Sequence, residues 1–113
     1  MKFKAKDSGK VRIIELTGRI VLGDGDRELV SAVQAALNEG CRNIVRDLSG
    51  VPYMDSSGLG HSAICKKRSV EKEAGIAVVI PRSSGIPVPV QFCLRLTYEA
   101  FDTVIDAVGS FAK

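Results

Sequence analysis

Three short runs of apolar and β-branched residues, separated by segments of helical length, constrain the fold of this chain most. They are VRIIEL at Val11 to Leu16, NIVRDL at Asn43 to Leu48 and IAVVI at Ile76 to Ile80. Such runs are typical of strands, and the uniformly apolar third run is typical of a strand buried on both faces. The alternation of strand and helix predicts an α/β fold.

The segment after the first run carries apolar residues at three- and four-residue steps, the spacing that forms one buried helical face. The first helix is expected from Arg27 to Asn38, ends at Gly40, and turns these residues inward: Leu29, Val30, Val33, Ala36 and Leu37. The second is expected from Ser57 to Ala74, ends at Gly75, and turns these residues inward: Leu59, Ala63, Ile64 and Val70.

Further strands and helices are expected near the two ends of the sequence. A strand near Phe3 to Lys6 is expected to pair with the first apolar run as a hairpin. Beyond a loop that starts at Arg82, the sequence predicts a helix at Val90 to Leu96, a strand at Tyr98 to Phe101 and a helix at Asp102 to Phe111, capped by Asp102 with Val104, Ile105 and Val108 inward. We therefore expect one domain, residues 1–113, built as a single layer of mixed β-sheet with helices packed against it.

Charge and composition limit the classes of partner. The net charge is only +3, and the densest basic cluster, Lys66 to Arg68, is followed by Glu71 and Glu73 at helical spacing. We interpret this cluster as a solvated helix face. No basic stripe with interleaved aromatic residues occurs, and tryptophan is absent, so nucleic-acid binding is not expected.

Cysteine and histidine usage bears on cofactors and location. Cys41, Cys65 and Cys93 lie far apart, which suits thiols in a reducing compartment, and a single histidine cannot build a common zinc site, so no metal or other cofactor is expected. The segment Met1 to Lys10 is too polar for a signal peptide, and no apolar run approaches membrane-spanning length. We expect a cytoplasmic protein without membrane contact.

Two enzyme classes find little support. Ser57 and His61 lie one helical turn apart, but the GxSxG pattern is absent, and a serine nucleophile needs a base that a third group orients. The loop at Gly23 to Gly25 resembles the start of GxGxxG, but Glu28 occupies the last glycine position and the acidic loop would repel a pyrophosphate. We expect no enzymatic activity.

The stretch VPYMDSSGLG follows the second strand candidate and opens the second helix. Asp55, Ser56 or Ser57 could each cap that helix. No Glu or Gln follows at the capping-box position, and Gly58 and Gly60 leave the first-turn amides uncovered. An anion, such as a phosphate on the serine, would be favoured there by these amides and the helix dipole. An ordinary strand–turn–helix junction, in which the serines only cap, remains open on these residues alone.

The motif YMDSSGLG, preceded by NIVRDLSGV and ELTGRIVLGDG, resembles the STAS domain of bacterial anti-sigma factor antagonists, or anti-anti-sigma factors. The resemblance runs in order from about Val11 to Gly75, with a weaker echo after Tyr98. It implies that the whole chain is one STAS domain. The family's acidic residue after LTG is replaced by Val21, with Asp24 or Asp26 as its substitute.

In that family the serine directly after the motif's aspartate is phosphorylated, and here that residue is Ser56. The resemblance implies a phosphoprotein that regulates transcription. Unphosphorylated, it binds an anti-sigma factor that is also a serine kinase and frees the sigma factor; phosphorylated, it releases that partner until a serine phosphatase acts. The free domain is expected to be a monomer. The implied partner-binding residues are Asp24, Asp55, Ser56, Ser57, Gly58 and Leu59.

Individual roles follow for the motif: Asp55 sets the turn, Ser57 is an adjacent cap and Gly58 keeps the helix start accessible. A different class also fits, a stand-alone STAS scaffold or nucleotide-binding module in which Ser56 is never phosphorylated. Two stretches depart from the family pattern. Arg46 is expected to lie at its strand's end or to pair with an acid, and Ser83 to Pro89, which contains a second SSG, replaces the start of the third helix with a loop.

Overall fold

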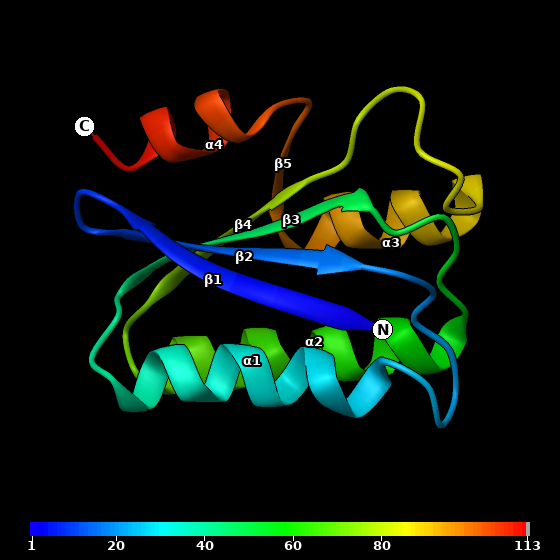
Figure 1. Cartoon of the computed structure of the whole chain (residues 1–113), viewed down its shortest axis with the longest axis horizontal. Coiled ribbons are helices and arrows are strands. Elements are labelled where there is room, and N and C mark those ends of the chain that lie inside the picture. Colours follow the sequence, from blue (N-terminus) through cyan, green and yellow to red (C-terminus); the bar gives the residue numbers. More distant parts are fainter. Residues whose placement is uncertain (113) are drawn as a thin grey trace.

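The protein forms one sheet of five strands, and Figure 1 shows helices on both of its faces. The computed structural model describes residues 1–112. In chain order the elements are β1 (Lys2–Ser8), β2 (Val11–Thr17), α1 (Asp26–Asn38), β3 (Asn43–Gly50), α2 (Ser56–Glu71), β4 (Gly75–Val79), α3 (Val88–Thr97), β5 (Glu99–Phe101) and α4 (Val104–Ser110). The strand order is β1-β2-β3-β4-β5, with β1 antiparallel to β2 and the other neighbours parallel. The predicted mixed sheet and its amino-terminal hairpin are confirmed.

The three apolar runs form the centre of this sheet. Successive side chains of a strand point to opposite faces, so Ile44 and Leu48 of β3 join the larger core while Val45 joins the smaller one. Every residue from Ile76 to Ile80 is buried, as the uniformly apolar run predicted.

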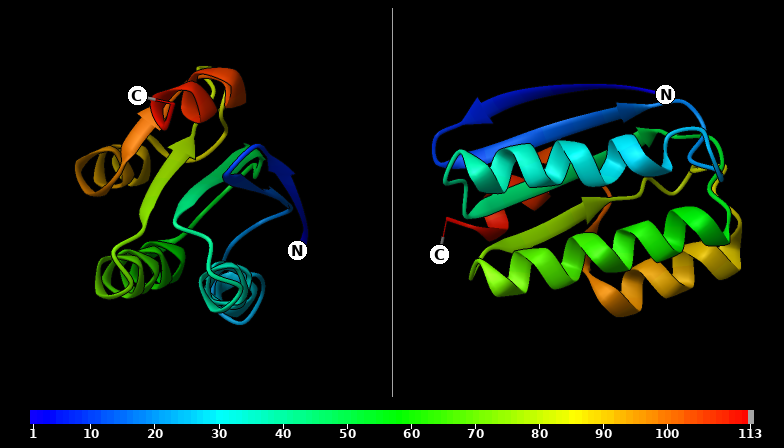
Figure 2. Two further views of the ribbon diagram at one scale, coloured as in Figure 1. Left: turned by 90° about the vertical axis from the view of Figure 1, so that its left-hand side faces the viewer. Right: turned by 90° about the horizontal axis from the view of Figure 1, so that it is seen from below.

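Helices α1, α2 and α3 cover one face of the sheet, and α4 covers the other (Figure 2). The larger core lies beneath the first three helices and includes Leu29 of α1 and Leu94 of α3. The smaller core lies beneath α4, which contributes Ala107. Helix α1 ends as predicted: Gly40 has a φ of 89°, and its N–H donates to the carbonyl of Leu37.

The inward face of α2 differs from the expectation. Its buried residues are all small: Gly58, Ser62, Cys65 and Ser69. Three residues that were predicted to point inward are instead exposed: Ala63, Ile64 and Val70. Helix α2 lies between α1 and α3 against the sheet (Figure 2), and small side chains allow its backbone this close approach. Ile64 and Val70 are therefore left on the outside, whereas Leu59 is partly buried.

The end of α2 and the carboxyl-terminal helices also correct the sequence-based bounds. Gly75 is not the stop of α2; the helix ends through Glu73, whose φ of 55° is left-handed, and Gly75 begins β4. Helix α3 begins at Val88, because prolines fit the first turn of a helix. Helix α4 is capped by Thr103 and not by Asp102. Its Ile105 points away from the core and is 83% exposed.

Arg46 lies in the middle of β3 and is fully buried beneath α2. Its Nη1 donates to the Ser62 hydroxyl at 3.1 Å, and its guanidinium stacks on the Tyr98 ring, 4.4 Å from the centroid. Within residues 1–112, its Nε and Nη2 have no hydrogen-bond partner and no carboxylate pairs with it. The expectation of a strand-end position or an acidic partner is wrong.

We predict that Arg46→Met leaves the free energy of unfolding unchanged or raises it by about 1–4 kcal/mol, because it removes a buried charge while keeping most of the volume. Arg46→Ala is the matched comparison; the cavity it creates should cost about 2–5 kcal/mol. Urea unfolding of the three proteins measures both differences. A large loss of stability in Arg46→Met would show that the charge itself stabilises the fold.

Candidate functional site

Three loops meet at the carboxyl ends of the parallel strands, the edge where α/β folds place their sites. The loops after β2 and β3 are joined by backbone hydrogen bonds: the N–H of Ile20 donates to Tyr53 at 3.0 Å, and the N–H of Asp55 donates to Ile20 at 3.2 Å. The loop after β4 reaches the same place. A Cβ on Gly85 would lie 2.6 Å from the carbonyl oxygen of Pro52, so only glycine permits this contact.

Asp55 is the N-cap of α2. Its Oδ1 accepts the N–H of Gly58 at 3.0 Å, and its Oδ2 accepts the N–H of Leu22 at 3.1 Å. These hydrogen bonds, that from Gly58 first, hold the pKa of Asp55 below its usual range. One carboxylate thus caps the helix and ties it to the loop after β2. The Gly58 amide is therefore occupied, contrary to the expectation of uncovered donors.

The hydroxyl of Ser57 does not cap α2, which corrects its expected role. It donates to Oδ2 of Asp26 at 2.8 Å. Asp26 is the first residue of α1, is only 2% exposed, and also accepts the backbone N–H groups of Gly23 and Arg27. The hydrogen bond from Ser57, supported by these two amides, lowers the pKa of Asp26 although burial by itself would raise it.

His61 completes this cluster without forming a catalytic triad. Its Nδ1 lies 2.8 Å from the carbonyl oxygen of Ser57 and 3.9 Å from Oδ2 of Asp26. Because a carbonyl only accepts, Nδ1 carries the proton. In a serine hydrolase the histidine accepts the serine proton, whereas here the Ser57 hydroxyl donates directly to the carboxylate. The geometry does not place His61 as the base for Ser57.

Ser56 and Ser57 differ in exposure although they are adjacent. Ser56 is the first residue of α2 and is exposed, whereas Ser57 is half-buried against Asp26. Successive helical residues are turned by about 100° from each other, so one hydroxyl faces α1 and the other faces outward. The exposed hydroxyl is the one within reach of another protein.

Gly58 is fully buried, which corrects its expected place at an accessible surface. A Cβ there would lie 2.4 Å from Cγ of Met54 and 3.1 Å from Cγ2 of Ile20. The glycine therefore allows α2 to start directly against the loop after β2. Its φ is not left-handed, so close packing and not backbone conformation requires the glycine.

The remaining sequence-predicted residues lie at different depths. Asp24 is exposed in the loop after β2, where its Oδ1 lies 3.4 Å from the amino-terminal nitrogen of Met1. Leu59 is half-buried and packs on the larger core. Sequence reasoning missed the pairing of Asp26 with Ser57. The signal that the sequence offers for it is the pair of acids, Asp24 and Asp26, in the loop before α1.

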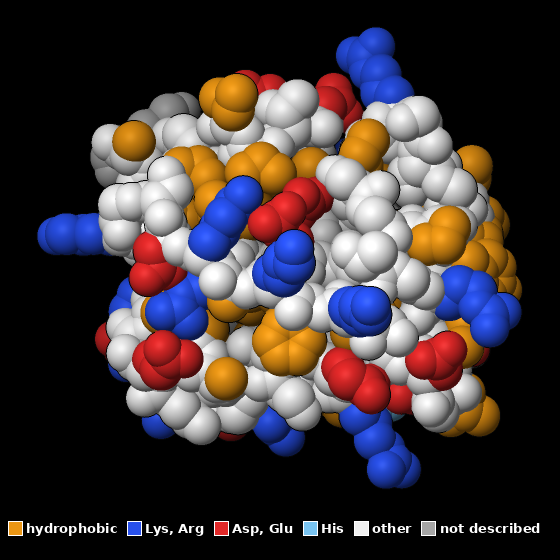
Figure 3. All heavy atoms as spheres, in the orientation of Figure 1, with side chains coloured by type: hydrophobic (Ala, Val, Ile, Leu, Met, Phe, Trp, Pro, Cys, Tyr) orange, Lys and Arg blue, Asp and Glu red, His pale blue; other side chains and the backbone are white. Residues whose placement is uncertain are grey.

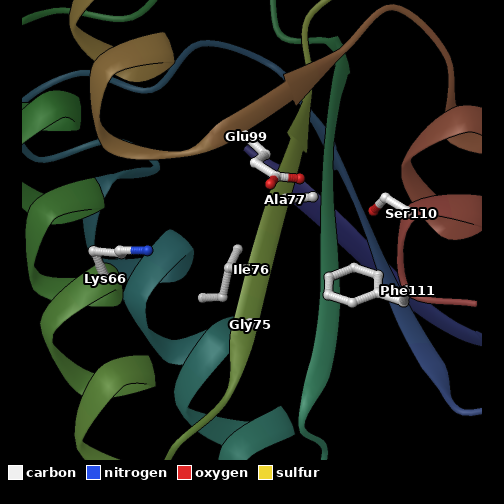
Figure 4. A pocket seen from close by; sticks show the side chains of 7 residues that line it. All are labelled: Lys66, Gly75, Ile76, Ala77, Glu99, Ser110 and Phe111. Atoms are coloured by element: carbon white, nitrogen blue, oxygen red, sulfur yellow. The ribbon is translucent and has the colours of Figure 1, made fainter. Parts of the chain in front are cut away.

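Asp55, Ser56 and Ser57 line none of five surface hollows found among residues 1–112. A hollow of about 300 Å³ lies at the amino-terminal end of β4, between Lys66, Glu99 and the ring of Phe111 (Figure 4). That end of the strand is opposite the loops that carry Asp55. In the loops that meet at the other end, Leu22 is 78% exposed and Tyr53 is 42% exposed. Apolar side chains also lie among charged ones on the right-hand side of Figure 3.

Residues 1–112 contain no group of three or more His, Cys, Asp or Glu side chains that could hold a metal ion. Among the same residues, none of the helices is both long and apolar enough to span a membrane.

Comparison with known proteins places this chain in a family. The model of the STAS domain matches residues 2–87. The chain is a member of the STAS domain family. No curated protein matches the sequence.

Solved structures share the fold of this STAS domain along its length. A putative anti-sigma factor antagonist from Thermotoga maritima has a TM-score of 0.83 at 21% identity, covering 98% of this chain and 95% of its own. The anti-sigma factor antagonist SpoIIAA in its unphosphorylated form has a TM-score of 0.70 at 15% identity, covering 98% and 97%. The Bacillus cell fate determinant SpoIIAA in the phosphorylated form has a TM-score of 0.62 at 20% identity, covering 97% and 99%.

We predict that Gly58→Ala destabilises the STAS domain by about 1–3 kcal/mol, because the added methyl overlaps Met54 and displaces the loop that holds Ile20. Gly60→Ala is the matched control on the same helix. A Cβ at Gly60 has nothing within 4 Å, so this change should stabilise the domain by about 0.5–1 kcal/mol. Urea unfolding measures both; equal effects would refute the packing account.

Acid should lower the stability of the folded domain through two carboxylates of the site. The pKa values of Asp26 and Asp55 are lowered in the folded state, so protons bind more readily to the unfolded chain. The stability that the two ionised carboxylates give the folded domain is complete above a pH of about 4, the ordinary pKa of a carboxyl group. This stability is lost as the pH falls through the lowered pKa values. We predict that Asp26→Asn is less stable than wild type at neutral pH but loses less stability on acidification. Unfolding curves from about pH 7 to about pH 3 test this; parallel curves would contradict it.

Proposed function

We propose that this STAS domain is a phosphorylation-controlled anti-sigma factor antagonist in the bacterial cytoplasm, with Ser56 as the phosphate acceptor. The observation that carries the proposal is the different environment of the two adjacent serines. Ser56 is exposed at the start of α2, whereas the hydroxyl of Ser57 is bonded to buried Asp26. A kinase therefore reaches the first hydroxyl more easily than the second.

The position of Ser56 suits a switch based on charge. The amino-terminal end of a helix carries partial positive charge, so the fold tolerates a phosphate there. On the outer side, the phosphate would add about −1.5 to −2 charges next to the carboxylate of Asp55, the preceding residue. A partner that fits the neutral serine would then meet clustered negative charge. Such like-charge contacts cost several kcal/mol, and each step of about 1.4 kcal/mol is a tenfold loss of affinity.

The proposed partners follow from the same site. In its unphosphorylated state the domain binds an anti-sigma factor that is also a serine kinase, and a serine phosphatase restores that state. The open loop surface, with its exposed Leu22 and Tyr53, suits a protein better than a small molecule. Support also comes from the likeness of the fold to SpoIIAA, whose structures include a phosphorylated form.

We predict that Ser56→Ala folds normally but is not phosphorylated, while Ser57→Ala is still labelled. Loss of the Ser56 hydroxyl should cost less than about 0.5 kcal/mol, because Asp55 is the cap and an exposed surface change is small. The kinase is first isolated by affinity capture on the wild-type domain and identified by mass spectrometry. Wild type and both variants are then incubated with the purified kinase and labelled ATP, and mapping of the phosphopeptide identifies the acceptor serine.

Affinity provides the second readout. Phosphorylated wild type should bind the captured partner at least about tenfold more weakly in calorimetry, and Ser56→Asp should reproduce part of this loss because a carboxylate carries less charge. Equal labelling of Ser56→Ala and wild type would place the acceptor elsewhere. Absence of any phosphate on Ser56 with an intact partner complex would favour a scaffold or a nucleotide-binding module.

A further inference from the structure

Leu22 lies at the tip of the loop after β2, and its side chain is 78% exposed. The loop turns tightly there: the N–H of Val21 donates to the carbonyl of Asp24 at 2.8 Å, and the N–H of Asp24 donates to the carbonyl of Val21 at 2.9 Å. Gly23, the second of the two central residues, has the left-handed φ of 79° that such a turn needs. The turn therefore holds a large apolar side chain out in solvent.

Hydrogen bonds to the rest of the domain fix this turn in place. The N–H of Leu22 donates to Oδ2 of Asp55 at 3.1 Å, and the N–H of Gly23 donates to Oδ2 of Asp26 at 3.2 Å. Each backbone amide from Val21 to Asp24 is thus bonded within the domain. Both carboxylates stand at the starts of helices, so the turn is tied to α1 and α2 together. A side chain on a backbone held in this way loses little conformational freedom when a partner covers it, and such preorganisation raises affinity.

The turn adjoins the candidate phosphate acceptor. Asp55, whose carboxylate holds the Leu22 amide, is followed directly by Ser56, the exposed first residue of α2. Tyr53, which is 42% exposed, belongs to the segment bonded to this loop, because its carbonyl accepts the N–H of Ile20 at 3.0 Å. Protein interfaces place a few apolar or aromatic anchors near the centre and polar groups around them. A protein that covers the hydroxyl of Ser56 therefore also meets Leu22.

We propose that Leu22 is the apolar anchor of this domain, and that the anti-sigma factor kinase carries an apolar pocket for it beside the site that receives the Ser56 hydroxyl. This inference rests on the proposed function and adds the chemistry of the partner's surface. Leu22 does not touch the reacting atoms, so it strengthens binding of the substrate and of the transition state equally. Burial of a leucine side chain is worth about ten- to a hundredfold in affinity.

Steady-state phosphorylation, and calorimetry without ATP, test the anchor with the kinase isolated on the wild-type domain and then purified. Leu22→Ala should raise the KM for this domain about tenfold or more and weaken binding by a similar factor, while kcat stays within about twofold of wild type. Leu22→Met keeps an apolar side chain of similar volume and should restore most of the affinity. The matched control is Ile105→Ala on α4, across the sheet (Figure 2), where the side chain is 83% exposed; it should behave like wild type.

The outcomes separate this inference from the proposed function. Urea unfolding checks that each variant keeps its fold, as changes at exposed positions should. Unchanged KM and affinity in Leu22→Ala, with Ser56 phosphorylated, would refute the anchor and leave the proposed function standing. A fall in kcat alone would indicate an effect on the chemistry, and an equal loss in Ile105→Ala would indicate unspecific apolar contact; either overturns the anchor. If no captured protein phosphorylates wild type on Ser56, the proposed function fails and the anchor fails with it.

Discussion

The carboxylate of Asp55 bonds two segments that lie far apart in the sequence, and the geometry of the candidate site depends on this link. One oxygen holds the Gly58 amide at the start of α2, and the other holds the Leu22 amide in the loop after β2. Both bonds require the helix to begin directly against that loop, where Gly58 leaves space for Met54 and Ile20. Asp55, the acid of the DSSG motif, therefore links α2 to the loop after β2, and it also places a negative charge beside the serine.

This link explains why the two neighbouring serines differ in exposure. Once Asp55 fixes the start of α2, the helical rotation directs Ser57 toward α1, where it meets Asp26, and leaves Ser56 facing outward. The buried carboxylate is satisfied by one hydroxyl and two backbone amides, so it needs no cation. A site of this kind presents one exposed hydroxyl at a capped helix start, which suits recognition by another protein.

The position of α2 over the sheet is set by a second group of polar contacts. Arg46 of β3 reaches Ser62, and the hydroxyl of Tyr98 donates to the Ser62 carbonyl oxygen. Burial raises the pKa of Tyr98, so its hydroxyl stays protonated as a donor. Helix α2, which carries the candidate acceptor, thus contacts the sheet mainly through small buried residues and these polar contacts. Several large apolar side chains of α2 and α3 are left exposed, namely Ile64, Val70, Val88, Phe92 and Leu96.

The sequence by itself determined the alternation of strands and helices, the buried central strand at Ile76 to Ile80, the glycine end of α1 and the family motif. These features are encoded locally, in periodicity, turn residues and short spacing. Only the tertiary structure decided which residue caps α2, that Ser57 pairs with Asp26, and that Arg46 is buried without an acid. Each of these depends on contacts between elements, since a helix between two others needs small inner residues whatever its own apolar pattern. The different environments of Ser56 and Ser57 were likewise decided by the tertiary structure, because they arise where the start of α2 meets the loop after β2 and the start of α1.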